Sequence, residues 1–125
     1  MKHIQEKKIT VSGRLRSFVF AFNGLKYTIR SQYNFRIHLG VGVIVVICGL
    51  VARLSSAEWC ILVLTMGLVI SMEAMNTAIE KLVDLVSPDY QEHAGIVKDL
   101  AAGAVLIAAI MAVIIGLILF LPKIL

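Results

Sequence analysis

Three long apolar runs limit this chain to a membrane fold. They cover residues 37–52, 59–72 and 100–121, and a helix needs about 20 mostly apolar residues to cross a hydrocarbon core roughly 30 Å thick. Hydrophobic residues make up 59% of the 125 residues, and the mean hydropathy is +0.91. A soluble chain of this size could not bury so much apolar surface. We therefore predict a single all-α domain that is integral to the membrane.

Polar breaks between the runs predict where the helices begin and end. Before the first run, apolar residues recur at helical spacing with basic residues off their stripe, which is typical of an amphipathic helix on the membrane surface; they are Leu15, Phe18, Phe22, Leu25 and Ile29. His38 and Arg53 are expected to mark the ends of the first span, and Pro122 to close the last. The expected order is a polar tail over residues 1–12, a surface helix over 13–30, a turn over 31–36, and spanning helices over 37–53, 59–86 and 98–121.

Charge is concentrated at the amino-terminal end of the chain. Residues 1–36 hold eight lysines and arginines against one glutamate, a balance of +7. Next to spanning helices this favours anionic lipid headgroups as the partner, and not nucleic acid. We expect this end in the cytoplasm, with no signal peptide before it. Three spans then place the connection between the second and third spans in the cytoplasm as well, and the C-terminus outside.

The second apolar run ends in a polar stripe. Glu73, Asn76, Glu80 and Asp84 are spaced by three, four and four residues, so they fall within an arc of roughly 80° on one helix face. Trp59 is expected at the membrane interface, and Glu73 lies roughly 21 Å further along the helix, inside the hydrocarbon. An ionisable residue at that depth indicates a functional site. The alternative is a helix that has left the membrane and carries a solvated acidic face.

The residues expected on the cytoplasmic side suit phosphoryl transfer. Carboxylates bind Mg²⁺ together with substrate phosphates, a lysine such as Lys98 neutralises phosphate charge, and a partly desolvated carboxylate can take a proton from an alcohol. The chain has no G-x-x-x-x-G-K-[ST] motif and no protein-kinase motif. From the residues alone, a proton-coupled transporter or an assembly subunit is equally consistent.

Two blocks of sequence resemble the small prokaryotic diacylglycerol kinases. The first is Glu73-x-x-Asn76-Thr77-Ala78-Ile79-Glu80-x-x-Val83-Asp84, and the second is Lys98-Asp99 followed by residues 101–105. Residues 34–38 (NFRIH) resemble the start of the first span in the undecaprenol kinase branch. The resemblance covers residues 12–121. It implies a homotrimer in the bacterial cytoplasmic (inner) membrane that uses ATP and Mg²⁺ to phosphorylate a lipid alcohol, either diacylglycerol or undecaprenol.

The resemblance also implies a role for each matching residue. Glu73 would be the general base on the lipid hydroxyl, and Glu80 would bind the metal that bridges the ATP phosphates. Asn76 and Asp84 would complete the polar site, and Asn76 and Ala102 would contact the lipid substrate. The remaining expected contacts to ATP are Asp89, Tyr90, Gln91, Lys98 and Asp99.

The chain departs from the family pattern in the turn before the first span. An ungapped register places Gln32 where the family usually has a second metal-binding glutamate. Gln32 is therefore the expected second ligand for the metal and for ATP, through a neutral oxygen. Arg14 and Arg16 are both candidates for the family's arginine near the N-terminus. The alternative function is a small proton-coupled exporter with Glu73 as its carrier carboxylate, although such exporters usually have an even number of spans.

Overall fold

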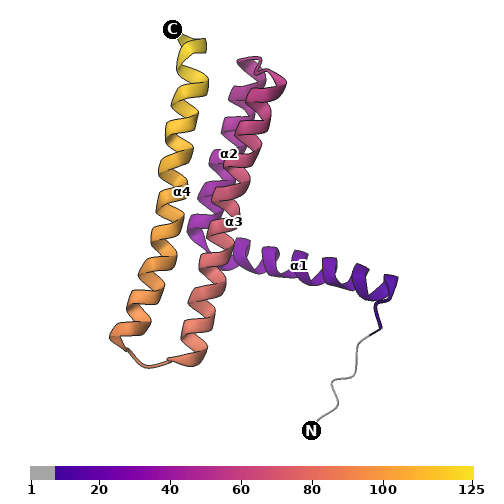
Figure 1. Ribbon diagram of the computed structural model, residues 1–125, viewed down its shortest axis with the longest axis vertical. Coiled ribbons are helices and arrows are strands. Elements are labelled where there is room, and N and C mark those ends of the chain that lie inside the picture. Colours follow the sequence, from indigo (N-terminus) through magenta and orange to yellow (C-terminus); the bar gives the residue numbers. More distant parts are fainter. Residues whose placement is uncertain (1–7) are drawn as a thin grey trace.

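The computed structural model describes residues 8–125 and contains four helices (Figure 1). They are α1 (Val11–Ser31), α2 (Tyr33–Val51), α3 (Ser56–Val86) and α4 (Glu92–Ile124). The last three are long and apolar enough to cross a membrane. The predictions of an all-α fold and of three spanning helices are confirmed. Residues 1–7 of the expected tail lie outside the described residues.

Two helices begin earlier than expected because residues before them act as caps. Thr10 precedes α1, and its side-chain oxygen accepts a hydrogen bond from the Gly13 backbone N–H at 3.1 Å. Ser55 precedes α3, and its side chain and that of Glu58 cap each other's backbone N–H groups. Both caps satisfy donors that have no partner inside the helix. The surface helix therefore begins at Val11 instead of residue 13, and α3 at Ser56 instead of residue 59.

The turn expected over residues 31–36 is reduced to one residue. Gln32 is extended, with φ −112° and ψ 113°, and separates α1 from α2. Helix α2 therefore begins at Tyr33, four residues before its expected start, and Figure 1 shows α1 running crosswise to α2 and α3. His38 consequently lies within α2 and does not mark its beginning. Arg53, by contrast, lies in the turn after α2 with φ 54°.

The last helix is longer at both ends than expected. It begins at Glu92, six residues before the expected residue 98, because Gln91 takes an extended cap conformation and its carbonyl accepts from the Gly95 N–H at 3.0 Å. A glutamate in the first turn also suits the positive end of the helix dipole. Pro122 does not close the helix, which continues to Ile124. Because Pro122 lies close to the end of α4, its missing backbone N–H removes only one helical hydrogen bond.

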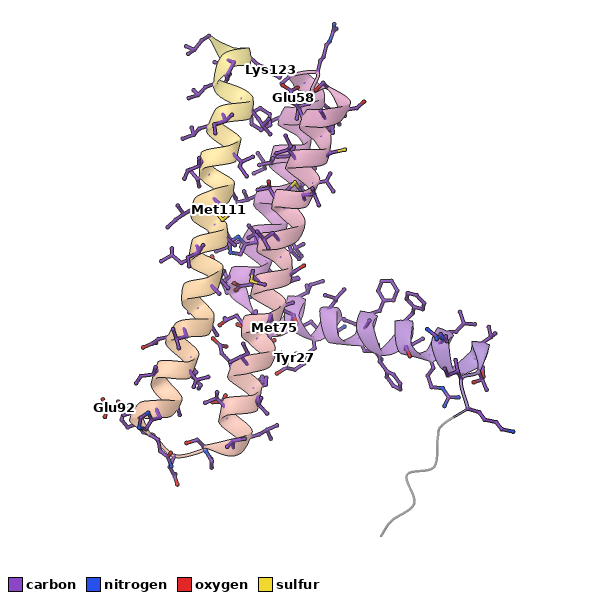
Figure 2. All side chains as sticks on the ribbon, viewed as in Figure 1. Tyr27, Glu58, Met75, Glu92, Met111 and Lys123 are labelled. Atoms are coloured by element: carbon purple, nitrogen blue, oxygen red, sulfur yellow. The ribbon has the colours of Figure 1, made fainter. Side chains whose placement is uncertain are left out.

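Helix α3 is the centre of the fold. It packs along α4, against α2, and at one place against α1. The α2–α3 turn and the C-terminus lie at one end, and the α3–α4 connection lies at the other, nearer α1 (Figure 1). Figure 2 shows Glu58 and Lys123 together at the first end and Glu92 at the second; the Glu58–Lys123 ion pair measures 3.2 Å.

Four contacts fix which residues lie at the same depth, or level, in these helices. A Cβ on Gly42 would meet Met66, and one on Gly49 would meet Trp59. Because α2 and α3 run in opposite directions, a residue of α2 and a residue of α3 lie at the same level when their two numbers add up to 108, as they do in both of these contacts. In the same way, the ion pairs Glu58–Lys123 and Asp84–Lys98 show that a residue of α3 and a residue of α4 lie at the same level when their two numbers add up to 181 or 182. The α3–α4 register is therefore the same at both ends.

Apolar side chains mostly face outward, as in a protein surrounded by lipid. The buried cluster is small and lies near the α2–α3 turn, where Leu54, Leu62 and Leu119 pack together with Trp59 beside them. Most large apolar residues of the spans are exposed in the chain, among them Leu64 and Leu106. The helices are held together by small residues at their closest approach as well as by this cluster.

The Trp59 and Leu54 side chains fill the space beside Gly49 of α2, and we expect Gly49→Ala to destabilise the fold. A Cβ at this position would lie 2.7 Å from the Trp59 ring and 3.1 Å from Leu54 Cδ1. Forcing the ring aside should cost about 1–3 kcal/mol, measured by unfolding in detergent with Trp59 fluorescence. Gly40→Ala is the matched control, because a Cβ there meets nothing within 4 Å. Equal stability of the two variants would contradict the α2–α3 contact.

Candidate active site

The contact between α1 and α3 indicates where the membrane surface lies along the polar stripe. Thr28 and Leu25 of α1 lie against Ala74 and Thr77 of α3, and Figure 2 shows the labelled Tyr27 near Met75. Amphipathic helices of this kind lie in the membrane interface. We therefore expect Glu73 at the hydrocarbon side of this contact, and the end of α3 beyond residue 81 past it.

Glu73 is buried in the interior of the three spans. Its side chain lies at the level of Phe35 of α2 and of Ala108 of α4, and the exposed fractions of the three residues are 3%, 2% and 3%. Within residues 8–125 its carboxylate makes no hydrogen bond or ion pair, although its backbone carbonyl accepts from the Thr77 hydroxyl at 3.0 Å. An acidic side chain that is so little exposed and has no partner is costly, so this position indicates a group that meets a ligand.

One turn further along, Asn76 and Glu80 form a pair of oxygen donors. The Asn76 Nδ2 donates to Glu80 Oε1 at 3.3 Å. The Asn76 Oδ1 is buried and has no partner among the described residues. By the α2–α3 register, the half-buried Gln32 lies at the level of Asn76. Asn76 and Glu80 therefore place an amide and a carboxylate together, and Gln32 lies at the level of Asn76 along the helices.

This donor set fits Mg²⁺ in the form that enzymes acting on phosphates use. Mg²⁺ prefers oxygen ligands and usually takes only one or two carboxylates, with the rest from water and substrate phosphates. In the part of the chain that the structure describes, no three Asp, Glu, His or Cys side chains are arranged as metal ligands. An ion here would rely on Glu80, on the unpartnered Asn76 oxygen and on phosphate oxygens. The residues present therefore fit a nucleotide-bound metal.

Asp84 and Lys98 form an ion pair between α3 and α4. Lys98 Nζ lies 2.5 Å from Asp84 Oδ1, and both side chains are partly exposed. Asp84 is about 38 Å along α3 from Trp59, beyond a hydrocarbon core of roughly 30 Å. The hydrogen bond from Lys98 holds the pKa of the Asp84 carboxyl below its ordinary value. Lys98 has three donor hydrogens, so it can contact a phosphate without leaving Asp84.

The remaining expected ATP contacts lie at the same end of the molecule. Asp89, Tyr90 and Gln91 form the α3–α4 connection and point to solvent, with Tyr90 91% exposed. Asp99 follows Lys98 on α4 and is also exposed. This group therefore surrounds the open end of the stripe but does not enclose a cavity in the single chain.

Three expected residues are not brought to Glu73 within the chain. Ala102 lies at the level of Glu80, about 10 Å along the helices from Glu73, and is exposed. Arg14 and Arg16 are exposed in the amino-terminal half of α1, which projects away from the other helices (Figure 1).

Sequence reasoning missed the contact that joins α1 to α3. The Lys81 ammonium lies 5.4 Å from the centre of the Tyr27 ring, within the range of a cation–π interaction. Thr28 and Thr77 are both buried where the two helices meet. The only sequence signal is that Tyr27 and Thr28 fall off the apolar stripe of α1, and nothing in the sequence names their partners.

Comparisons with known proteins identify the family. The family model described as prokaryotic diacylglycerol kinase matches residues 19–120. The chain is 44% identical over 108 residues to the undecaprenol kinase of Bacillus subtilis, covering 86% of this chain and 88% of that protein. It is 47% identical over 112 residues to the diacylglycerol kinase of Synechocystis, covering 89% of this chain but 64% of that protein. With the diacylglycerol kinase of Escherichia coli it shares 44% identity over 54 residues, 43% of this chain and 44% of that protein.

An all-α membrane fold with oxygen donors and a lysine at one end of its spans is a suitable frame for a membrane phosphotransferase. The chain belongs to the prokaryotic diacylglycerol kinase family. It is a lipid kinase of the diacylglycerol kinase or undecaprenol kinase type, and the exporter and assembly-subunit alternatives are set aside.

Proposed function

We propose that the chain transfers the γ-phosphate of ATP to the hydroxyl of a lipid alcohol, with Glu73 as the general base. The observation that carries this proposal is the placement of Glu73. It is 3% exposed, unpartnered among the described residues, and lies one to two helical turns from the Asn76–Glu80 pair. A lipid hydroxyl arriving from the membrane would meet Glu73, while a nucleotide arriving from water would meet Glu80.

The reaction needs one proton transfer and one substitution at phosphorus. Glu73 accepts the proton of the lipid hydroxyl as the hydroxyl oxygen attacks the γ-phosphorus. A new P–O bond forms, and the bond from the γ-phosphorus to the β–γ bridging oxygen breaks. ADP leaves with the electron pair of that bond. Glu73 then releases its proton to water at the interface.

The other stripe residues would hold the nucleotide. Glu80, with Asn76 and Gln32, would hold the Mg²⁺ that offsets charge on the ATP phosphates when it is bound. Lys98, kept in place by Asp84 at 2.5 Å, would contact phosphate oxygens. Asp89, Tyr90, Gln91 and Asp99 would contact the nucleotide from the α3–α4 connection and the start of α4.

Undecaprenol is our first candidate for the lipid, and diacylglycerol is the second. The named undecaprenol kinase matches this chain over most of both proteins. The two kinds of diacylglycerol kinase match over 64% and 44% of their own lengths. The relatives are named for both lipids, so both are candidate substrates. A phosphoryl-transfer assay with each lipid distinguishes between them.

The assembly and orientation that we propose are a homotrimer with α1 and the α3–α4 connection in the cytoplasm. Arginine and lysine residues concentrate at this end of the molecule, which the positive-inside rule places in the cytoplasm. The single chain leaves the nucleotide end open and holds Arg14, Arg16 and Ala102 away from Glu73. Neighbouring copies would supply what one chain leaves uncovered.

The test is a phosphoryl-transfer assay on purified protein in lipid micelles. ATP labelled at the γ-phosphate and Mg²⁺ are supplied with either undecaprenol or diacylglycerol, and label in the lipid fraction is counted. We expect transfer to undecaprenol at the higher kcat/KM. Transfer to neither lipid would overturn the proposed function.

The glutamine at position 32 gives a prediction on the metal. We expect Gln32→Glu to lower the Mg²⁺ concentration needed for half-maximal activity, because a carboxylate adds charge beside Asn76 and Glu80. A titration of activity against free Mg²⁺ at saturating ATP measures this. Asn23→Asp, which makes the same amide-to-carboxylate change, is the control, since Asn23 is exposed on α1 and has no role in the proposed site. An unchanged Mg²⁺ dependence in Gln32→Glu would mean that Gln32 is not a ligand.

A further inference from the structure

Helix α1 crosses α3 beside the polar stripe, and the two helices pack loosely there. The crossing is made mostly by small side chains, and a cavity of about 330 Å³ remains between the helices. A Cβ on Gly24 of α1 would meet nothing within 4 Å, so close packing at this position does not fix how α1 lies on α3. Figure 1 shows the amino-terminal part of α1 running away from the other helices. The position of α1 on α3 therefore depends on the few contacts at this crossing.

Two buried threonines contribute packing to this crossing, and each donates its hydroxyl hydrogen within its own helix. Thr28 of α1 and Thr77 of α3 are both buried beside the cavity. The Thr28 hydroxyl donates to the Gly24 carbonyl and the Thr77 hydroxyl to the Glu73 carbonyl, each at 3.0 Å. A hydroxyl has one hydrogen to donate, so neither threonine has one left for the other helix.

Tyr27 and Lys81 form a polar contact between the two helices. The Lys81 ammonium lies 5.4 Å from the centre of the Tyr27 ring, within the range of a cation–π interaction. Tyr27 directly precedes Thr28 in α1, and Lys81 lies one turn after Thr77 in α3. Both members of the pair are exposed, in contrast to the threonines beside them. The pair therefore joins the helices at the exposed side of the crossing.

The same contact connects the two segments that carry the proposed metal ligands. Lys81 directly follows Glu80 in α3. Gln32 directly follows α1, and its backbone N–H donates to the Thr28 carbonyl at 2.9 Å. Gln32 also lies at the level of Asn76 along the helices. A shift of the last turn of α1 on α3 would therefore move Gln32 relative to Asn76 and Glu80.

We propose that Tyr27 and Lys81 are positioning residues for Gln32. By holding the last turn of α1 on α3, they keep Gln32 at the level of Asn76, and they act through Gln32 without contacting the metal themselves. The effect on activity rests on the proposed function, because it requires Gln32 and Glu80 to hold the metal together. The effect on the position of α1 does not depend on the reaction and can be measured separately.

Two variants separate positioning from a direct effect of charge. Lys81→Met removes the cation but keeps the length of the side chain, and Tyr27→Leu removes the ring but keeps every charge. We expect each variant to raise the Mg²⁺ concentration for half-maximal activity about two- to fivefold, the factor that corresponds to an exposed cation–π contact. The kcat at saturating Mg²⁺ should stay within twofold of the wild type. Charge alone would act in the opposite direction in Lys81→Met, because removing a cation next to Glu80 favours Mg²⁺.

Conservative and combined variants test whether the two residues act as a pair. Lys81→Arg keeps a cation over the ring and should restore the Mg²⁺ dependence of the wild type. Phe22→Leu is the control for the loss of a ring, because Phe22 is exposed on α1 outside this crossing. The double variant Tyr27→Leu with Lys81→Met should shift the Mg²⁺ dependence no further than one substitution alone, and Lys81→Met should add no shift in Gln32→Ala. Additive shifts in either combination, or a lower Mg²⁺ requirement in Lys81→Met, would overturn the proposal.

A distance measurement without metal or nucleotide tests the position of α1 independently of activity. Nitroxide labels are attached at Val19→Cys on α1 and Leu85→Cys on α3, both exposed positions, after Cys48 and Cys60 are replaced by alanine. Labelled protein is diluted with unlabelled protein, and double electron–electron resonance gives the distribution of distances. We expect a narrow distribution that broadens in Lys81→Met and Tyr27→Leu and narrows again in Lys81→Arg. An unchanged distribution in both variants would overturn the proposal. If the wild type phosphorylates neither lipid, the proposed function fails, and this distribution still decides whether the pair holds α1.

Discussion

Glu73→Gln is expected to lower kcat for lipid phosphorylation by at least about 100-fold, the lower part of the range that a general base contributes. The amide has the size of the carboxyl group but cannot take a proton from the lipid hydroxyl. Because Glu73 lies two turns from Glu80, binding of MgATP should be retained. The measurement is the initial rate of label transfer to undecaprenol, together with the dissociation constant of a fluorescent ATP analogue.

A matched carboxylate serves as the control for this variant. Glu92 is exposed in the first turn of α4, at the same end of the molecule and outside the proposed site. Glu92→Gln makes the same chemical change and should leave the rate within twofold of the wild type. Near-normal turnover in Glu73→Gln would mean that another group takes the proton.

Glu80→Gln is expected to raise the Mg²⁺ concentration for half-maximal activity by at least about tenfold, since even the loss of a group that only supports a metal ligand costs about 10–100-fold in metal affinity. The amide oxygen that this variant introduces can still accept the hydrogen bond that Asn76 now donates to Glu80 at 3.3 Å. The local structure should therefore survive, and only the charge offered to the metal is lost. Titrations of activity against Mg²⁺ at fixed ATP measure the shift.

The Glu80 variant also separates metal binding from proton transfer. Raising Mg²⁺ should restore much of the rate in Glu80→Gln, because the metal can then be held by the remaining oxygens. The same addition should not help Glu73→Gln, whose defect is in the chemical step. If extra Mg²⁺ rescued both variants or neither, the two roles would be assigned wrongly.

The position of Glu73 along α3 could be predicted from the sequence because it depends only on distance along one helix. Fourteen residues separate it from Trp59, and a helix converts that spacing into a depth within the hydrocarbon. The apolar runs likewise predicted three spans, which the structure contains. Both predictions use only the period of the helix and the thickness of the membrane.

The partners of the polar residues could not be predicted in the same way. Lys98 and Asp84 are 14 residues apart, and Glu58 meets Lys123 at the other end of α3. Each pair depends on the register of α3 against α4, and the spacing of residues along one helix does not set its register against another. The stripe expected to act as one set is therefore divided: Asn76 binds Glu80, whereas Asp84 binds Lys98.

Helix boundaries were mispredicted where polar residues extend a helix. Residues 92–97 and 33–36 contain polar side chains and were expected as loop, yet both are helical. Adding residues to a formed helix is favourable once the first turn exists, so a spanning helix extends outward until a residue such as Gln32 or Gln91 takes an extended conformation. The polarity of a segment next to a span is a weak guide to where that happens.

The most direct test of the account locates the metal on the protein. Mn²⁺ can replace Mg²⁺ on oxygen ligands, and it broadens the NMR signals of nearby methyl groups. With a non-hydrolysable ATP analogue, we predict broadening of Val83 and Val97 near the nucleotide end, reversal by excess Mg²⁺, and a weaker effect in Glu80→Gln. Broadening centred on Val51 and Ile124, at the opposite end of the helices, would contradict the placement of the nucleotide beside Asn76 and Glu80.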